Sequence, residues 1–453
     1  MESLTKNSVH NAEITGYASD GSGVCRIGGQ VVFVKNALRG EICRVRILKA
    51  GKNVAYGKIE ELTVPSLHRT EPDCPIYGKC GGCGTLHMDY AEELELKREK
   101  VADALKRIGG VETAVPPVLG SGREAYRNKV IFAVSLQDGH AVTGFFRPRS
   151  HDVVPAESCL IQAEPLEKAA SAVRRWMDRY RVPAYDERTG RGTVRHVFCR
   201  IGRKTGQLQV TLVSAEEQIP HPEALTAELR AVCPETASVI LNVNKTMGNT
   251  VLAGSFRTLW GADAIEDELC GLRFSLSPRS FYQVNRDQAE RLYETALQYA
   301  GLTGKETVLD LYCGTGTITL CLARRAARVI GCEIVPEAVR DAEENAGRNG
   351  IANAEFLCGD AGDAAEMLEA SGLRPDVIVA DPPRKGMEEK TVRQIAAMAP
   401  ARVVYVSCDP ATLARDLARF STLGYRTEQV QPVDMFPGTP HVETVVLMSR
   451  VKD

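Results

Sequence analysis

The sequence contains no long hydrophobic run and no excess of charge of one sign. None of its apolar runs approaches the roughly 20 residues that a membrane-spanning helix needs, and its first twenty residues are polar, without the apolar core of a signal peptide. The 56 basic and 58 acidic residues leave a formal charge of −2, which excludes a uniformly basic nucleic-acid binder. Internal repeats and low-complexity segments are absent as well. We therefore expect a cytoplasmic protein with no membrane partner.

The composition is that of a globular protein with more than one domain. The chain has 453 residues, of which 44% are hydrophobic and 25% are charged, and this balance excludes disordered and collagen-like classes. At about 150 residues per domain, the length predicts two to four domains. The fourteen cysteines should be reduced in such a chain, so a cluster of them indicates metal binding or catalysis. The sequence does not give the oligomeric state, and a monomer is expected.

The N-terminal segment, residues 1–62, has the pattern of a small β-barrel with a basic patch. Short β-rich runs at 31–34 and 42–48 are separated by turns that contain glycine, which predicts an OB-like barrel of about five strands. Residues 1–59 carry nine basic and four acidic side chains, a net charge of +5. Such a patch can bind a phosphate backbone, or it can merely keep the domain in solution, and charge alone does not separate the two.

The middle of the chain combines a cysteine-rich segment, a helix and a mixed domain. Apolar residues at helical spacing predict an amphipathic surface helix over 90–108, which ends at a Gly-Gly pair. Residues 63–89 and 118–270 are assigned to a central α+β domain, with helices expected near 165–180 and 221–232. This domain contains little recognisable chemistry apart from its cysteines.

The C-terminal region, residues 271–453, alternates buried-type β runs with helical stretches. The six runs are 307–312, 328–333, 354–357, 377–381, 402–407 and 442–448. This alternation predicts an α/β fold with a mostly parallel sheet covered by helices on both faces. A sheet of this kind binds its ligand at the carboxyl ends of its strands.

The first of these runs leads into a glycine-containing turn that is typical of cofactor binding. Gly314 and Gly316 permit a tight turn and a close approach of backbone to ligand, and Glu333, at the end of the second run, can accept both hydroxyls of a ribose. A dinucleotide site would have a third glycine near Thr319. Its absence favours a nucleoside cofactor without phosphates, such as S-adenosylmethionine. Asp360 follows the third run, where it either contacts an adenine or caps a helix.

Two further β runs end in residues that can carry chemistry. Asp381 precedes two prolines, which stop the strand and leave the carboxylate in the crevice. Cys408 ends the fifth run beside a predicted helix start, which should favour the thiolate form. A thiolate at this place suits methylation of C5 of a pyrimidine, because its addition to C6 turns C5 into a nucleophile. A base must then remove the C5 proton, and Glu443, before the last run, is the candidate.

Three cysteines lie within ten residues near the predicted domain boundary. Cys74, Cys80 and Cys83 form a C-x5-C-x2-C pattern with glycines that allow the chain to wrap. This spacing indicates a metal site and leaves the fourth ligand open. Four thiolates would suit zinc and an iron–sulfur cluster equally.

Five motifs in this order resemble those of the RNA uracil-5-methyltransferase family, which makes 5-methyluridine in tRNA and large-subunit rRNA. They are found at 281–285 (FYQVN), 310–316 (DLYCGTG), 381–386 (DPPRKG), 407–410 (SCDP) and 441–443 (HVE). The resemblance covers nearly the whole chain and implies that Cys408 is the nucleophile and Glu443 the base. It also implies an S-adenosylmethionine site lined by Gln283, Tyr312, Glu333, Asp360 and Asp381, with Thr317 nearby.

The resemblance is to the branch of this family that acts on 23S rRNA. It implies that residues 1–62 are an RNA-binding TRAM domain and that Cys74, Cys80, Cys83 and Cys159 hold a [4Fe-4S] cluster. It further implies that the helix in 90–117 packs on the Rossmann-like catalytic domain, that 126–129 (YRNK) touches RNA, and that the target base is flipped into the cleft. Three other functions remain open: tRNA uridine C5 methylation, an amino-group methyltransferase of the Asp-Pro-Pro type, and a non-catalytic RNA-binding protein. Arg384, where the amino-group enzymes usually have an aromatic residue, weakens the second of these.

Overall fold

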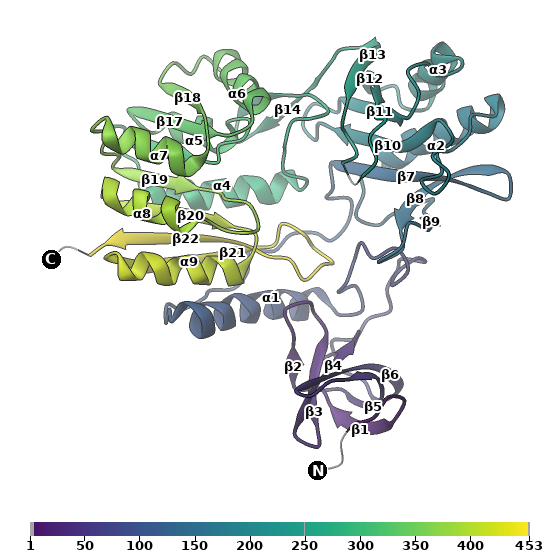
Figure 1. The fold of residues 1–453 in the computed structure, drawn as a ribbon, viewed down its shortest axis with the longest axis horizontal. Helices are drawn as coiled ribbons and strands as arrows, with labels where there is room; N and C mark the ends of the chain where they lie inside the picture. Colours follow the sequence, from purple (N-terminus) through teal and green to yellow (C-terminus); the bar gives the residue numbers. More distant parts are fainter. Residues whose placement is uncertain (1–3, 249, 452–453) are drawn as a thin grey trace.

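In the computed structural model, which describes residues 4–248 and 250–451, the chain forms three sheets of six or seven strands and one separate hairpin (Figure 1). The N-terminal sheet lies at one end of the molecule, and the long helix α1 separates it from the C-terminal sheet. The central sheet lies beside the C-terminal one. No helix in the described parts of the chain is long and apolar enough to cross a membrane.

The N-terminal sheet contains six strands in the order β1-β5-β6-β4-β3-β2. They are β1 (Val9–Glu13), β2 (Gly16–Tyr17), β3 (Gly23–Ile27), β4 (Gln30–Lys35), β5 (Ile42–Ala50) and β6 (Val54–Val64). Alternate residues of β5, Cys43, Val45 and Ile47, are fully buried, as expected for a strand with one face on a core. The sheet has one strand more than the five predicted, because the two residues of β2 pair with β3.

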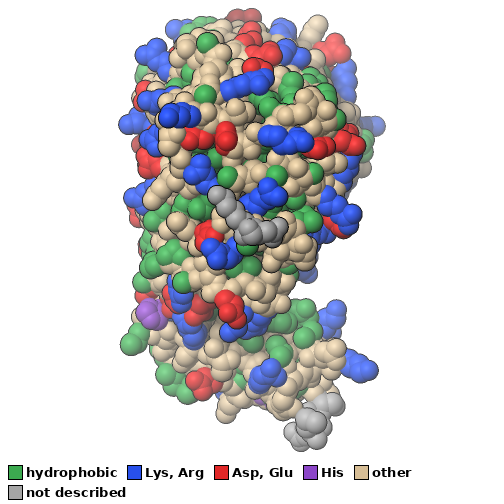
Figure 2. All heavy atoms as spheres, turned by 90° about the vertical axis from the view of Figure 1, so that its left-hand side faces the viewer, with side chains coloured by type: hydrophobic (Ala, Val, Ile, Leu, Met, Phe, Trp, Pro, Cys, Tyr) green, Lys and Arg blue, Asp and Glu red, His purple; other side chains and the backbone are tan. Residues whose placement is uncertain are grey.

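The charge of this sheet is less one-sided than residues 1–59 suggest. Strand β6 continues into Glu60 and Glu61, which pair with Arg46 at 2.6 Å and Arg44 at 2.7 Å. Over residues 1–62, nine basic side chains stand against six acidic ones, a net charge of +3. On the face of the molecule drawn in Figure 2, basic and acidic side chains are likewise interspersed.

Helix α1 (Tyr90–Ala104) begins where the sequence predicts a helix, with Asp89 as its cap, and continues into a π turn (Leu105–Gly109). Its last turns pack on α9 (Pro410–Thr422), so this helix covers the C-terminal sheet, as predicted. On its other side Arg39 of the N-terminal sheet pairs with Glu92 at 3.0 Å and with Glu99 at 2.6 Å. Helix α1 therefore connects the two regions through packing on one side and charge on the other.

The central sheet has the strand order β13-β12-β11-β10-β7-β8-β9. Its strands are β7 (Lys129–Gln137), β8 (His140–Phe146), β9 (Val153–Pro155), β10 (Val194–Ile201), β11 (Leu208–Ser214), β12 (Thr236–Val243) and β13 (Ser255–Gly261). Helices α2 (Glu164–Tyr180) and α3 (Pro222–Val232) pack on it and on each other, around a core that includes Trp176. A separate hairpin, β14 (Ile265–Leu269) and β15 (Leu272–Leu276), follows this sheet in the chain.

The C-terminal sheet has the order β18-β17-β16-β19-β20-β22-β21. Its strands are β16 (Thr307–Leu311), β17 (Arg328–Glu333), β18 (Ala354–Cys358), β19 (Val377–Ala380), β20 (Arg402–Ser407), β21 (Tyr425–Val433) and β22 (Glu443–Arg450). The first five are parallel, and β22 runs antiparallel to both of its neighbours. The mostly parallel sheet of the prediction is therefore confirmed. Strand β21 was not predicted, because its polar residues and Pro432 do not form a buried-type β run.

Helices cover both faces of this sheet, as predicted. One core is formed with α4 (Arg286–Ala300), α5 (Thr317–Ala323) and α6 (Pro336–Arg348). The other is formed with α7 (Ala361–Ala370), α8 (Glu389–Met398) and α9, together with the end of α1. Because both faces are buried, the carboxyl ends of the parallel strands are where a ligand can reach the sheet.

Candidate active site

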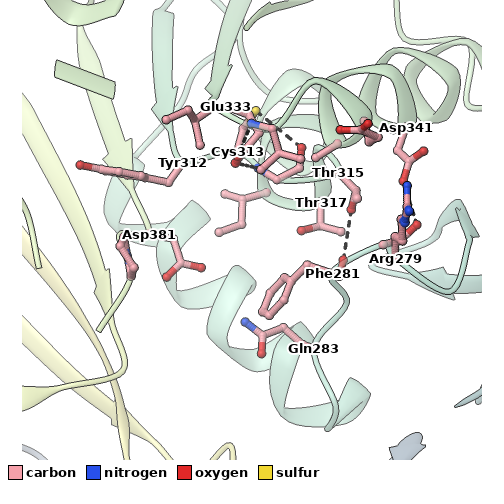
Figure 3. A pocket seen from close by; sticks show the side chains of 18 of the residues that line it. Arg279, Phe281, Gln283, Tyr312, Cys313, Thr315, Thr317, Glu333, Asp341 and Asp381 are labelled. Carbon is pink, nitrogen blue, oxygen red and sulfur yellow. Dashed lines mark hydrogen bonds between the residues drawn. The ribbon is translucent and has the colours of Figure 1, made fainter. Parts of the chain in front are cut away.

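A cleft of about 1330 Å³ lies at the carboxyl ends of β16, β17, β19 and β20. Its lining includes all seven residues that the sequence predicts for catalysis and cofactor binding: Gln283, Tyr312, Glu333, Asp360, Asp381, Cys408 and Glu443. Figure 3 shows Gln283, Tyr312, Glu333 and Asp381 around this hollow. The fold thus gathers residues that lie up to 160 positions apart in the sequence.

The glycine turn after β16 holds the carboxylate of Glu333 in place. Gly314 has φ +56° and donates its backbone N–H to Glu333 Oε2 at 3.0 Å, while Val335 N donates to Oε1 at 3.0 Å. Gly316 has φ +80°, and a Cβ there would lie 3.1 Å from Ala342 Cβ, so a larger residue would be both strained and crowded. The turn is therefore pre-formed, with Glu333 presented to the cleft.

Asp360 has one of the two roles that the sequence leaves open, that of a helix cap, and its place in the cleft is compatible with the other. It caps α7, with Oδ1 accepting hydrogen bonds from Gly362 N at 2.9 Å and Asp363 N at 3.4 Å. It also lines the cleft. Because the cap uses only one carboxylate oxygen, the other is left for a ligand.

Two aspartates at the carboxyl ends of β16 and β19 form no ion pair with any side chain that the structure describes. Burial raises the pKa of Asp381 to about 7. Asp310, on β16, accepts a hydrogen bond from Thr319 Oγ1 at 2.6 Å, yet burial also raises its pKa to about 7. A cation entering the cleft would be attracted to Asp381 and would lower its pKa.

Strand register places Cys408 and Glu443 next to each other. Ser407 on β20 lies opposite Thr444 on the antiparallel strand β22. The residue after Ser407 and the residue before Thr444 therefore meet at the edge of the sheet, where both line the cleft. A thiol and a carboxyl group in one cleft are the pair that nucleophilic addition and proton removal require.

The free protein does not hold Cys408 as a thiolate, contrary to the prediction from the helix start. Burial, together with the charges of Glu443 and Asp381, raises the pKa of Cys408 to about 11, and Arg384 opposes this only in part. The start of α9 is two residues away, and Asp409 satisfies its N–H groups. Desolvation and two carboxyl groups thus outweigh the helix terminus.

Glu443 is buried, with only 5% of its surface exposed. Burial, together with the charge of Asp381, raises its pKa to about 8, and the charge of Arg384 opposes this only in part. In the free protein at neutral pH, Glu443 is therefore largely protonated. A basic side chain or another cation close to it would restore the carboxylate.

The cleft also contains residues that sequence reasoning did not select for a role. Arg384, Phe436 and His441 line it, and the charge of Arg384 acts on both Cys408 and Glu443. The rings of Phe436 and His441 meet edge to face, with centroids 6.2 Å apart. Arg384 and His441 lie inside two of the recognised motifs, whereas Phe436 lies in a loop with no motif that could have identified it.

The predicted RNA contact at 126–129 is partly wrong, because two of its four residues are buried against the C-terminal region. Tyr126 donates its hydroxyl to Pro437 O at 3.0 Å, and Asn128 Nδ2 donates to Gln283 O at 2.9 Å. These two side chains connect the domains rather than facing solvent. Arg127 and Lys129 are half-buried.

The four cysteines predicted to bind metal are free thiols in one region of the structure. Cys74 and Cys159 line one small pocket, and burial together with the other three thiols raises the pKa of Cys83 to about 12. Burial raises the pKa of Cys159 to about 11. Within residues 4–248 and 250–451, however, no three side chains of the metal-ligating types lie as close together as a single ion requires.

Comparison with known proteins gives a family match for the N-terminal and the C-terminal region of the chain. Residues 262–451 match the family model described as tRNA (Uracil-5-)-methyltransferase, and residues 4–59 match the TRAM domain. A protein of Clostridium tetani named as an uncharacterized RNA methyltransferase is 44% identical over 451 residues, covering 99% of this chain and 98% of that protein. A Bacillus cereus protein with the same name is 42% identical over 451 residues, at the same coverage of both chains.

A solved structure has the same architecture over almost the full length. It is that of Pyrococcus abyssi tRNA (uracil-54, C5)-methyltransferase in complex with S-adenosyl-L-homocysteine, with a TM-score of 0.78 and 27% sequence identity. The match covers 97% of this chain and 99% of the other. It confirms the order of an N-terminal TRAM domain, a central domain and a C-terminal methyltransferase domain.

Proposed function

This chain belongs to the RNA uracil-5-methyltransferase family and uses S-adenosylmethionine to methylate C5 of uracil in RNA, and we propose that its substrate is 23S ribosomal RNA in the cytoplasm. The target uridine is flipped out of the RNA into the cleft, where the residues named above act on it. The observation that carries the mechanism is the register of β20 and β22, which brings a nucleophile and a buried acid together.

In the proposed reaction, Cys408 and Glu443 lose their protons to solvent once the positive charge of the methyl donor is in the cleft, because that charge lowers their pKa values. The thiolate of Cys408 then adds to C6 of the uracil, and C5 becomes an enolate-like nucleophile. C5 then takes the methyl group, and the bond between that methyl carbon and the donor's sulfur breaks with its electron pair left on the sulfur, which gives S-adenosyl-L-homocysteine as the second product. Glu443 removes the C5 proton, and the bond between C6 and the sulfur breaks, which returns the thiolate and releases 5-methyluridine.

We assign Gln283, Tyr312, Glu333, Asp360 and Asp381 to the methyl donor, which supplies an electrophilic methyl group on a positively charged sulfur. The pre-formed carboxylate of Glu333 suits a ribose, and the free oxygen of Asp360 suits an adenine. Neither Asp381 nor Glu443 forms an ion pair with a described side chain, and a cleft that receives a cation needs such unpaired carboxyl groups.

A fluorinated substrate tests the mechanism. RNA that contains 5-fluorouridine has no C5 proton to remove, so the enzyme should remain covalently attached after methyl transfer. We expect a protein–RNA adduct that survives denaturing electrophoresis, requires S-adenosylmethionine and disappears in Cys408→Ala. An active wild-type preparation that forms no adduct would contradict the mechanism, and retained activity in Cys408→Ala would favour an amino-group methyltransferase.

The choice of 23S rRNA rests on the cysteine set and on the resemblance of the motifs to the rRNA branch. The presence of a TRAM domain does not distinguish rRNA from tRNA as the substrate. The Pyrococcus abyssi protein, which is named for tRNA, matches 97% of this chain, including that domain. Equal amounts of 23S rRNA fragments and tRNA transcripts, each offered alone and then together, test this choice. Methylation of rRNA fragments is expected, and methylation of tRNA alone would replace the proposed substrate.

RNA contacts are proposed for the TRAM domain and for two cations beside the cleft. Arg127 and Lys129 form no ion pair with any described side chain, and Arg127 Nε is buried without a hydrogen-bond partner. Burial, together with the charges of Arg200 and Arg127, lowers the pKa of Lys129 to about 8. A nearby phosphate would satisfy the unpartnered N–H and return the pKa of Lys129 toward its ordinary value.

We propose that Cys74, Cys80, Cys83 and Cys159 hold a [4Fe-4S] cluster. The residues fit this group, since all four are free thiols, and burial and other thiols of the set raise the pKa values of Cys83 and Cys159, which shows that the set lies close together. A four-iron cluster spaces its ligands more widely than a single tetrahedral ion, which agrees with the thiols being near one another without the spacing of a one-ion site. Anaerobic purification should give a brown protein, and a colourless one with stoichiometric zinc would contradict the assignment.

A further inference from the structure

The loop 434–441, which connects β21 to β22, forms one wall of the cleft. Phe436 and His441 line the cleft from this loop, and Glu443 begins the strand that follows it. Glu443 thus lies two residues beyond the loop, so a displacement of the loop acts on the end of β22 that carries the proposed general base.

The carbonyl oxygens of this loop are bound from outside the cleft. Five of them accept hydrogen bonds from other parts of the chain: Met435 O from Asn285 Nδ2 at 3.3 Å, Phe436 O from Lys97 Nζ at 3.3 Å, Pro437 O from Tyr126 Oη at 3.0 Å, Gly438 O from Gly84 N at 2.8 Å and Thr85 N at 3.1 Å, and Pro440 O from Lys100 Nζ at 2.8 Å. Two of the donors lie on α1, and two directly follow Cys83. Helix α1 and the cysteine segment thus hold the loop from behind.

Lys97 is the centre of this arrangement. Its ammonium group is fully buried and donates to Glu93 Oε1 and to Asp434 Oδ1, both at 2.6 Å, in addition to Phe436 O. Glu93 Oε1 also accepts from Gly438 N at 2.7 Å, and its other oxygen pairs with Arg123. The cluster of two cations and two carboxylates is neutral as a whole, and all three protons of Lys97 are used.

We propose that Lys97 is a positioning residue for this reaction: it holds the loop 434–441 so that Glu443 faces the C5 proton of the uracil that Cys408 has attacked at C6. The inference rests on the proposed function and adds a residue that touches neither substrate nor cofactor. Without Lys97, the carboxylates of Glu93 and Asp434 would be buried near each other with one cation fewer, and the loop would have to move to hydrate them. A displacement of about 1 Å at a reacting group can cost about 100-fold in rate.

The cofactor residues on β16, β17 and β19 and the nucleophile after β20 do not belong to this loop. Displacing the loop should therefore slow removal of the C5 proton while leaving cofactor binding and addition of Cys408 intact. With ordinary uridine, the methylated covalent complex should accumulate, because its breakdown needs Glu443. A residue that only stabilises the fold would instead weaken cofactor binding, adduct formation and turnover together.

The test compares Lys97→Met, the charge-balanced pair Lys97→Met with Asp434→Asn, and Lys106→Met as a matched control, since Lys106 is an exposed lysine just beyond α1. For each we would measure the melting temperature, the S-adenosylmethionine affinity, the rate of adduct formation with 5-fluorouridine RNA, and turnover with ordinary RNA. Both Lys97 variants should bind S-adenosylmethionine within about twofold of wild type. Turnover should fall about 10- to 100-fold, with covalent complex accumulating on ordinary uridine.

Normal turnover in a folded Lys97 variant would overturn the proposal. So would a parallel loss of cofactor binding and adduct formation, or unfolding of both variants while Lys106→Met folds, because each makes Lys97 a residue of the fold alone. Failure of the wild-type enzyme to form the 5-fluorouridine adduct is a separate outcome, which would remove the proposed mechanism itself.

Discussion

Arg44 and Arg46 of the TRAM domain lie in ion pairs at the surface, whereas Asp381 and Glu443 of the cleft are buried without an ion pair to any described side chain. Arg44 and Arg46 each meet a glutamate of the neighbouring strand in solvent. Asp381 and Glu443 lie at the edge of the C-terminal sheet, and burial raises their pKa values to about 7 and about 8, respectively.

This difference shows which charges are available for function. Exposed pairs are screened by water and contribute little to stability. Buried carboxyl groups without partners destabilise the free protein, and such groups are typical of sites where a ligand supplies the missing charge. The predictions below separate the two kinds of charge, beginning with the largest expected effect.

Replacing Glu443 should have the largest effect, because it removes the base from the reaction. Glu443→Gln is expected to lower turnover by about 10²- to 10⁴-fold and to trap the methylated covalent complex on ordinary uridine, as seen by denaturing electrophoresis. Glu366→Gln, on the exposed face of α7, is the control and should turn over normally. Rapid product release by Glu443→Gln would assign the base to another residue.

Replacing a cysteine of the segment 74–83 should have the second-largest effect, because these thiols are proposed to hold a cluster that also stabilises the fold. Cys83→Ser is expected to lose iron and visible absorbance and to lower the melting temperature by several degrees, since a structural metal contributes folding free energy. Cys358→Ser replaces an exposed thiol far along the chain and should change neither. Unchanged iron content and melting temperature in Cys83→Ser would exclude it as a ligand.

Asp381→Asn should trade function for stability in a pH-dependent way. The unfolded carboxyl ionises near 3.8 and the folded one near 7, so the cost of burying it grows as the pH rises from 4 to 7 and is constant above that. The melting temperature of the variant should therefore exceed that of wild type, and the difference should be larger at pH 8 than at pH 5. Each kcal/mol of stability corresponds to about 2–4 °C. The affinity of the variant for S-adenosylmethionine should fall. An equal difference in melting temperature at both values would show that Asp381 is not a buried acid.

The smallest effects should come from the TRAM domain. Lys49→Ala removes an exposed cation that pairs with no carboxylate in the described part of the chain, and it should reduce the salt dependence of RNA binding by about one ion. Arg46→Ala removes a cation that is already paired with Glu60, so it should change the salt dependence of RNA binding less. RNA affinity measured at several salt concentrations would distinguish them, and equal losses would mean that RNA displaces Glu60 from Arg46.

The sequence predicted correctly the positions of cleft residues that directly follow β-strands. It did not predict properties that depend on neighbours from distant parts of the chain. The order of β runs and turns was sufficient to place Glu333 and Asp381 at the sheet edge, because parallel strands end on the same side. The protonation of Cys408 could not be predicted, since it depends on Glu443, which lies 35 positions away in the chain. Tyr126 has the chemistry of an RNA contact in the sequence, yet the fold uses it to bind Pro437.

The amphipathic stripe of α1 shows the same division. Val101 and Leu105 are buried, as periodicity predicts, but Glu93 and Lys97 are buried too. A periodic pattern identifies apolar faces, and it gives no sign that charged residues will find partners from another part of the chain.

Residue types and local order by themselves determined the fold class and the cofactor class, and they selected Cys408 and Glu443 for the proposed roles of nucleophile and base. The tertiary structure alone decided that Cys408 and Glu443 meet, because only the antiparallel pairing of β22 with β20 sets Thr444 opposite Ser407. It also decided their protonation and the support of the loop behind them. These properties depend on burial and on charges from distant segments, which act through space rather than along the chain.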